Sequence, residues 1–251
     1  MKNPVDDDTT TNVALNVLVT AHPDDESMFF LPVMRALISR ADEKVWLICL
    51  STGDYDGLGK IREKEMLNAG TMLGLDKTIV CDNLKDHPTE RWPSNHVSNE
   101  IESVLKDNLP KDSTPFSMIR FITFDEGGVS GHVNHTDTYL GVVDLLRRKR
   151  ASSGTRISGP SFEGWQLKTE TNLISKYIPV MAWLWLLFSL FKSAQISRVL
   201  EETESYRHYA LIQPSLNWNA MATHQSQFVW YRRLFVVFSC YTYFNKLQPI
   251  R

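Results

Sequence analysis

The sequence predicts an α/β protein with a mostly parallel sheet that is covered by helices on both faces. Short apolar runs alternate with longer helical segments over the first half of the chain, which is typical of a parallel sheet. Polar clusters directly follow two of the expected strands, where such sheets bind ligands. The 251 residues suffice for one large α/β domain, and we expect a helical, aromatic-rich C-terminal appendage.

The expected elements follow from apolar periodicity and from the glycines and prolines between them. The expected strands are apolar runs that cover Val13–Thr20, Val45–Leu50, Thr78–Cys81 and Ser117–Phe124. The expected helices are a stretch that ends near Ile38, then Lys60–Leu73 and Ser98–Asn108. Ser51–Gly59 contains three glycines and is expected to be a loop.

We divide the chain into four parts by composition. Residues 1–12 form a polar tail without the features of a signal peptide or an N-terminal anchor. Residues 13–146 form the main α/β domain, and 147–165 form a basic loop or insertion rich in serine and glycine. Residues 166–251 are the C-terminal part of the same domain.

One apolar run, at 177–191, has two interpretations. It has about fifteen residues, which is short of the roughly twenty needed for an upright bilayer span. Its tryptophans favour a short helix at a membrane surface, whereas its length equally permits a buried core helix.

Composition excludes some classes of function. The net charge is −2, from 27 basic and 29 acidic residues, and the basic residues are scattered, so nucleic acid is not an expected partner. Cys49, Cys81 and Cys240 are far apart and have apolar neighbours, so we expect buried thiols in a reduced compartment.

Two polar clusters predict a metal site. His22 and Asp25 are three residues apart after the first strand, and His132 and His135 have the same spacing after the fourth. A catalytic Zn²⁺ or similar divalent ion takes about three imidazole or carboxylate ligands and keeps one position open for water. We therefore expect the two loops to meet at the edge of the sheet.

Neighbouring carboxylates can divide the chemical work. Asp25 would bind the ion, while Asp24 would act as the base towards a water whose pKa the ion lowers to about 7. His132, as an imidazolium or through an N–H, would stabilise the oxyanion of an amide under attack. The alternative for the Asp pair is a helix N-cap, but two histidine clusters at strand ends argue against turn chemistry alone.

The segment Ala21–Glu26, AHPDDE, resembles the signature of the LmbE-like, or PIG-L, deacetylase superfamily. Further passages similar to its eukaryotic branch are Asp56–Arg62 with Glu65, Phe124–His135, and His224–Leu234. The resemblance implies a Rossmann-like layered α/β sandwich. It also implies Zn²⁺, or another divalent metal, on His22, Asp25 and His135, with Asp24 as base, His132 as oxyanion partner and Arg62 towards the inositol side of the substrate.

The resemblance further implies removal of the N-acetyl group from N-acetylglucosaminyl-phosphatidylinositol, the second step of GPI-anchor assembly, at the cytosolic face of the endoplasmic reticulum membrane. Members of that branch commonly have an N-terminal membrane helix, which this sequence does not display, so membrane contact would come from residues 177–191 and the aromatic tail. The alternatives are a soluble deacetylase of a smaller N-acetylglucosaminyl conjugate, and a non-catalytic scaffold.

Overall fold

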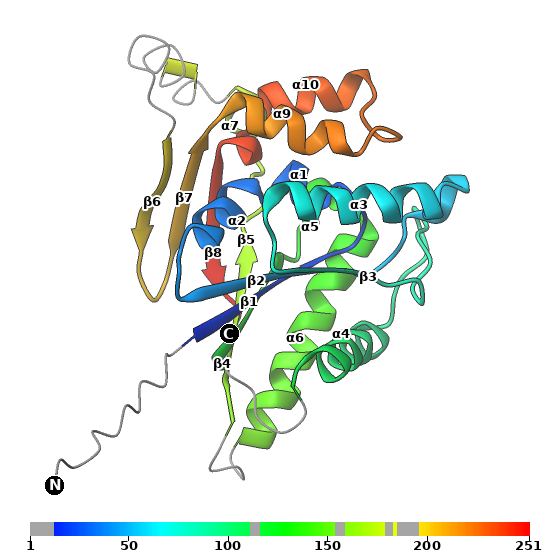
Figure 1. Cartoon of the computed structure of the whole chain (residues 1–251), viewed down its shortest axis with the longest axis vertical. Helices are drawn as coiled ribbons and strands as arrows, with labels where there is room; N and C mark the ends of the chain where they lie inside the picture. Colours follow the sequence, from blue (N-terminus) through cyan, green and yellow to red (C-terminus); the bar gives the residue numbers. More distant parts are fainter. Residues whose placement is uncertain (1–12, 111–115, 154–158, 179–182, 185–195) are drawn as a thin grey trace, which may run out of the picture.

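The computed structural model describes residues 13–110, 116–153, 159–178, 183–184 and 196–251. Within these residues, eight strands form one sheet in the order β3-β2-β1-β4-β5-β8-β7-β6 (Figure 1). The strands are β1 (Val13–Thr20), β2 (Glu43–Cys49), β3 (Lys77–Val80), β4 (Phe116–Phe124), β5 (Ser161–Leu167), β6 (Ile196–Glu202), β7 (Arg207–Ile212) and β8 (Phe244–Pro249).

The first five strands in the sequence are parallel neighbours, and the last three join the β5 edge as antiparallel strands. The prediction of a mostly parallel, Rossmann-like α/β sheet is therefore confirmed. Strand β1 lies between β2 and β4, so the chain leaves it in one direction along the sheet and returns on its other side. Such a reversal of strand order is where α/β sheets form their ligand crevice.

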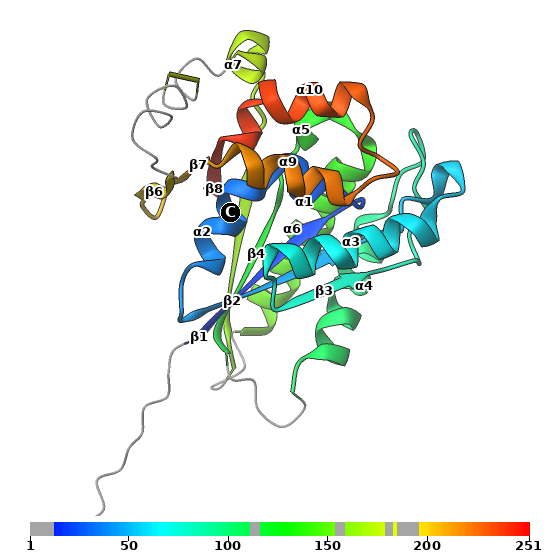
Figure 2. The ribbon, with the colours of Figure 1, turned by 45° about the horizontal axis from the view of Figure 1, so that its top comes forward.

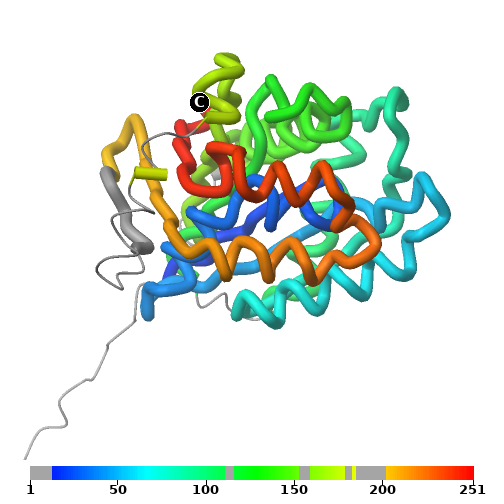
Figure 3. The backbone as a smooth tube through the Cα atoms, turned by 90° about the horizontal axis from the view of Figure 1, so that it is seen from above, coloured from blue at the N-terminus to red at the C-terminus, as the bar shows by residue number. Residues whose placement is uncertain are grey.

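Helices cover both faces of the sheet (Figure 3). One face carries α4 (Ser94–Asn108) and α6 (Val133–Ser153), and the other carries α2 (Leu31–Ile38), α3 (Gly59–Leu73) and α9 (Pro214–Thr223). The remaining helices are short segments near the strand ends: α1 (Asp25–Phe29), α5 (Gly128–Gly131), α7 (Leu173–Tyr177), α10 (Trp230–Phe238), η1 (Asp54–Asp56) and η2 (Cys240–Thr242). Figure 2 shows α1, α5 and α10 grouped at one end of the molecule.

The core lies between the sheet and these two helical layers. Val17, Leu18 and Val19 of β1 point alternately to the two faces and are all buried, because a central parallel strand is covered on both faces. This burial explains why β1 has the unbroken apolar sequence from which its bounds were predicted. Cys49 and Cys81 are buried free thiols as expected, and burial raises the pKa of each.

The basic loop predicted over 147–165 is wrong in two places. Helix α6 continues to Ser153, and β5 begins at Ser161. Arg148 and Lys149 lie on the surface of this helix and pair with Glu102 of the adjacent α4, so the basic composition here belongs to a helix surface and not to a loop. The C-terminal part was expected to be helical, and it does contain α9 and α10, but it also adds three strands to the sheet that were not predicted.

The apolar run at 177–191 falls largely outside the described residues, which include only 177–178 and 183–184 of it. Among the residues that are described, no helix has both the length and the apolar character needed to cross a membrane.

Candidate active site

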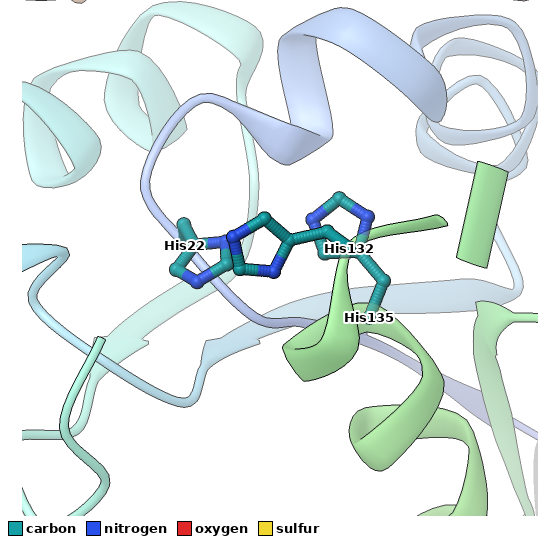
Figure 4. Close-up of side chains that lie close together, drawn as sticks. All are labelled: His22, His132 and His135. Atoms are coloured by element: carbon teal, nitrogen blue, oxygen red, sulfur yellow. The ribbon is translucent and has the colours of Figure 1, made fainter. Parts of the chain in front are cut away.

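The two predicted loops meet at the carboxyl ends of β1 and β4, on either side of the strand reversal. Figure 4 shows three imidazoles gathered there. His22 comes from the loop after β1, while His132 and His135 come from the segment that opens α6 after β4. The sheet thus brings together side chains that lie more than a hundred residues apart.

The carboxylate of Asp25 lies between two of these imidazoles. Its Oδ1 is 3.2 Å from Nε2 of His135, and its Oδ2 is 3.8 Å from Nδ1 of His22. The Oδ2 atom also accepts hydrogen bonds from the backbone N–H groups of Ala21, at 3.1 Å, and His22, at 2.8 Å. Burial opposes ionisation of Asp25, but the two imidazoles outweigh it and hold its pKa well below the usual range.

Hydrogen bonds fix which nitrogen of each ring faces Asp25. Nδ1 of His135 lies 2.9 Å from the carbonyl oxygen of Gly128, which can only accept, so Nδ1 carries the proton. Nε2 of His22 lies 3.1 Å from a carboxylate oxygen of Asp86 and 3.3 Å from the amide oxygen of Asn134, and it donates in the same way. Each ring therefore turns its other nitrogen towards Asp25, and that nitrogen could bind a metal ion once it is deprotonated, as in metal-binding histidines whose second N–H is held by a protein acceptor.

His132 completes a possible three-histidine site with His22 and His135, because one nitrogen of each ring lies within 4.8 Å of the others. Its orientation differs from theirs, since Nδ1 of His132 accepts the backbone N–H of Asn134 at 3.2 Å. Burial, together with the neighbouring His22 and His135, lowers the pKa of His132 to about 4. At neutral pH this ring is uncharged and has its proton on Nε2, so it offers an N–H and not an imidazolium.

Asp24 occupies the N-cap position of α1, but its side chain makes no capping hydrogen bond. Its carboxylate instead pairs with the guanidinium of Arg232 from α10 and lies 3.8 Å from Nη2 of Arg62. Burial raises the pKa of Asp24, although the two guanidinium groups oppose this. The helix-cap alternative is thus not observed, and the carboxylate faces the site.

Arg62 is buried on α3 and links two loops. It donates hydrogen bonds to the carbonyl oxygens of Gly53, at 2.8 Å, and Pro23, at 2.9 Å. Its Nη1 also lies 3.7 Å from Oδ2 of Asp86. These contacts hold the loops after β1 and β2 together beneath the site.

A cavity of about 620 Å³ opens over these groups. Its lining includes every side chain that the sequence predicted for the site: His22, Asp24, Asp25, Arg62, His132 and His135. The rest of the lining comes from α1, η1, α5, α7, α10 and two irregular loops, and it includes several aromatic rings. A cavity of this size with a few convergent polar groups suits a small-molecule ligand.

Backbone strain is concentrated beside the cavity. Among the described residues, Asp24 (φ 96°) and Val129 (φ 60°) are the two non-glycine residues with positive φ. Val129 is held in place by its N–H, which donates to Oγ1 of Thr169 at 2.9 Å, and by its carbonyl, which accepts from Nζ of Lys176 at 2.7 Å. Strain of this kind persists where the surrounding structure determines it, most often at functional sites.

Sequence reasoning missed a buried pair that supports Asp24. Nε2 of His224 lies 2.7 Å from Oε1 of Glu26, and both side chains are fully buried. Oε2 of Glu26 accepts the backbone N–H of Asp24 at 3.2 Å. His224 has no other candidate ligand at metal-ligand spacing in the sequence. It was noted only because the segment His224–Leu234 resembles the family. Asp86, in an irregular loop, gave no signal.

Comparison with known proteins connects this geometry to a family. A family model described as "PIG-L: GlcNAc-PI de-N-acetylase" matches residues 17–146. The chain is 32% identical over 236 residues to the N-acetylglucosaminyl-phosphatidylinositol de-N-acetylase of Bos taurus, which covers 92% of this chain and 82% of that protein.

Solved structures share the fold at low identity. The N,N'-diacetylchitobiose deacetylase of Pyrococcus horikoshii matches with a TM-score of 0.58 at 13% identity, over 94% of this chain and 83% of its own. A 4-carboxy-2-hydroxymuconate hydratase of Pseudomonas putida also has a TM-score of 0.58, at 11% identity, over 95% of this chain and 97% of its own. Because one fold carries a deacetylase and a hydratase, the activity has to be argued from the site.

Proposed function

We propose, since the chain belongs to the GlcNAc-PI de-N-acetylase family, that it is a metal-dependent amide hydrolase. Its reaction would remove the N-acetyl group from N-acetylglucosaminyl-phosphatidylinositol, which gives acetate and glucosaminyl-phosphatidylinositol. The observation that carries this proposal is the Asp25 carboxylate between Nδ1 of His22 and Nε2 of His135, at the base of a cavity. A non-catalytic scaffold would need none of these groups.

The donor set fits a divalent ion, with Zn²⁺ as the first choice. Ligands of a tetrahedral Zn²⁺ lie roughly 3.3–3.6 Å from each other, and the two Asp25 contacts, at 3.2 and 3.8 Å, lie close to that range. His22 Nδ1, Asp25 and His135 Nε2 would hold the ion. His132 is not included, because its Nδ1 accepts a backbone N–H and its Nε2 therefore carries the ring proton. When bound, the ion would supply Lewis-acid activation of water and of the amide carbonyl.

The chain's other residues take the remaining steps. Asp24 would accept the proton of the attacking water and return it to the amine nitrogen as the C–N bond breaks. Its burial supports this role, since burial raises its pKa towards that of a working acid and base. The neutral Nε2–H of His132 would donate to the oxyanion. Arg62 would orient Asp24 and reach towards the inositol part of the substrate.

The substrate carries its acyl chains in a membrane, so we place the reaction at a membrane surface, on the cytosolic face of the endoplasmic reticulum. The support for this location is the substrate in the name of the bovine relative. A soluble deacetylase of a smaller N-acetylglucosaminyl conjugate would use the same residues, and the two differ only in substrate. A direct comparison of substrates therefore separates them.

The test is release of acetate by the purified full chain with Zn²⁺, measured on N-acetylglucosaminyl-phosphatidylinositol in detergent and on its water-soluble headgroup. Asp24→Asn should retain the metal and lose at least about a hundredfold in rate, because a positioned base contributes about 10²–10⁴-fold. Asp42→Asn makes the same chemical change on the exposed loop before β2 and should leave the rate unchanged. No acetate from either compound with any divalent metal would remove the proposal.

Ligand assignment has its own measurement. His135→Ala should lower the metal content of the purified protein well below one ion per chain, whereas His132→Ala should keep the ion and lose rate. Equal loss of metal in both variants would instead support the three-histidine site.

A further inference from the structure

We propose that α7 and α10 form a docking surface for an anionic lipid bilayer, next to the mouth of the cavity. We call this surface the apolar rim, and it consists of exposed side chains of the two helices: Leu173, Ile174, Tyr177, Trp230, Tyr231, Leu234, Val237 and Phe238. The inference rests on the proposed function, and it names the surface by which a lipid-linked substrate would be reached.

The first observation is the amount of apolar side chain that α10 leaves in solvent. Its exposed apolar residues recur at 230, 231, 234, 237 and 238, which is the spacing of one helix face. Trp230, the most exposed of them, is 71% accessible. Helices that lie in a membrane interface have this pattern, with aromatic and aliphatic side chains on one face.

The second observation is that α7 extends the same surface. Leu173 and Ile174 are 71% and 69% accessible. The rings of Tyr177 on α7 and Phe235 on α10 are 6.5 Å apart between centroids, so the helices are neighbours, and Figures 1 and 2 show both at the same end of the molecule. Contiguous apolar surface of this kind marks an interaction site.

The third observation is continuity with the site. Tyr177 on α7 and Tyr231, Leu234 and Phe238 on α10 belong both to the rim and to the cavity lining. A ligand whose polar head lies against Asp25 would therefore have its apolar part directed to the rim.

Charge selects the partner. The two helices contain Lys176, Arg232 and Arg233 and no acidic residue. Arg232 pairs with Asp24 and Lys176 donates to the carbonyl of Val129, so Arg233 is the exposed basic residue of this surface. Basic residues beside an apolar helix face favour an anionic lipid surface, because each near the surface adds to the attraction. A phosphatidylinositol bilayer satisfies both the apolar and the basic character of this surface, whereas a second copy of the chain would bring like charges together.

The experiment measures sedimentation of the full chain with vesicles of phosphatidylcholine, with and without phosphatidylinositol. The double variant Ile174→Ser with Trp230→Ser changes one residue of each helix, neither of which lines the cavity. The matched control is Leu67→Ser with Met72→Ser, two apolar residues of α3 that are 42% and 40% accessible. We expect the partition coefficient to fall at least about tenfold in the rim variant, since burying one large apolar side chain contributes that much or more. The control should bind like the unmodified chain.

Charge is tested separately with Arg233→Gln, which should weaken binding to phosphatidylinositol vesicles by about fivefold and leave the weaker binding to phosphatidylcholine unchanged. This variant also keeps the test decisive if the double variant does not fold. Equal binding by rim and control variants would overturn the proposal, as would a chain that sediments no more with vesicles than without them. Self-association that the rim variant abolishes, without vesicle binding, would assign the surface to a second copy instead.

Vesicle binding requires no catalysis, so it fails or succeeds independently of the proposed reaction. If the reaction is also as proposed, the rim variant should keep its rate on the water-soluble headgroup and lose it on substrate embedded in vesicles. Loss on both substrates would indicate damage to the site and would contradict the role of the rim.

Discussion

The buried contact between Glu26 and His224 should contribute strongly to stability, and its removal can be predicted in magnitude. Both side chains are fully buried, and the two atoms that meet are 2.7 Å apart. Burial opposes protonation of His224, but the adjacent Glu26 outweighs it, so the pKa of His224 is raised. Glu26 also accepts hydrogen bonds from the N–H of Asp24, at 3.2 Å, and the hydroxyl of Ser27, at 2.5 Å.

Glu26→Ala removes one partner and leaves an imidazole buried opposite a void. Removing one member of a buried ion pair lowers the free energy of unfolding by about 3–5 kcal/mol. Glu26→Gln keeps the shape and an acceptor for His224, so only the charge-assisted part of the hydrogen bond is lost, about 1–2 kcal/mol. The order of stability should be unmodified chain, then Glu26→Gln, then Glu26→Ala.

The assay is urea unfolding at pH 6 and at pH 8.5. Because the folded pKa of His224 lies above its unfolded value of about 6.5, its contribution is fully present below pH 6.5 and is lost as the pH rises through the folded pKa. The difference between the unmodified chain and Glu26→Gln should therefore be larger at pH 6. Glu102→Ala, which breaks partly exposed ion pairs with Arg148 and Lys149, should cost only about 0–1 kcal/mol. A Glu26→Ala variant as stable as this control, or a difference that grows with pH, would refute the reasoning.

Two further predictions concern the loop before α6. A Cβ at Gly128, where φ is +57°, would lie 3.0 Å from Cβ of His135, so Gly128→Ala should lower metal affinity in a zinc titration. Gly131→Ala, with φ +77° and no atom within 4 Å of its Cβ, should lower only stability, by about 1 kcal/mol, and equal affinities in the two variants would contradict this. Asp125 is buried and accepts the N–H groups of Gly127, at 3.0 Å, and Thr169, at 2.7 Å. Asp125→Ala leaves both unpaired and should cost about 2–5 kcal/mol in urea unfolding, so a loss under 1 kcal/mol would show that the loop does not need it.

The first four strands of the parallel half are predictable from the sequence because they are short apolar runs, of which β1, β2 and β4 are largely buried. β1 has the bounds Val13–Thr20 that its apolar run predicts, and the other three predicted strands agree to within about two residues at each end. The antiparallel half is not predictable from the sequence, because β6 (ISRVLEE) and β8 (FNKLQP) mix apolar and charged residues and contain no continuous apolar run. The β5 strand was hidden for the same reason in the predicted insertion.

The residues of the site also fall into a group that the sequence predicts and a group that it does not. His22, Asp25 and His135 were expected together because each follows a strand end at ligand spacing, and the structure places the carboxylate between the two rings. Asp86 and Arg232 contact His22 and Asp24 from an irregular loop and from a C-terminal helix. Such contacts depend on tertiary packing over long separations and leave no local pattern in the sequence.

The contacts of Asp24 and Glu26 with the C-terminal tail have a consequence for synthesis of the protein. Arg232 and His224 lie 208 and 198 residues after their partners. On the ribosome, β1 to β5 and the proposed metal-binding side chains emerge long before these two residues leave the exit tunnel. A transcript that stops before codon 224 would therefore encode every proposed metal ligand and neither of the groups that pair with Asp24 and Glu26.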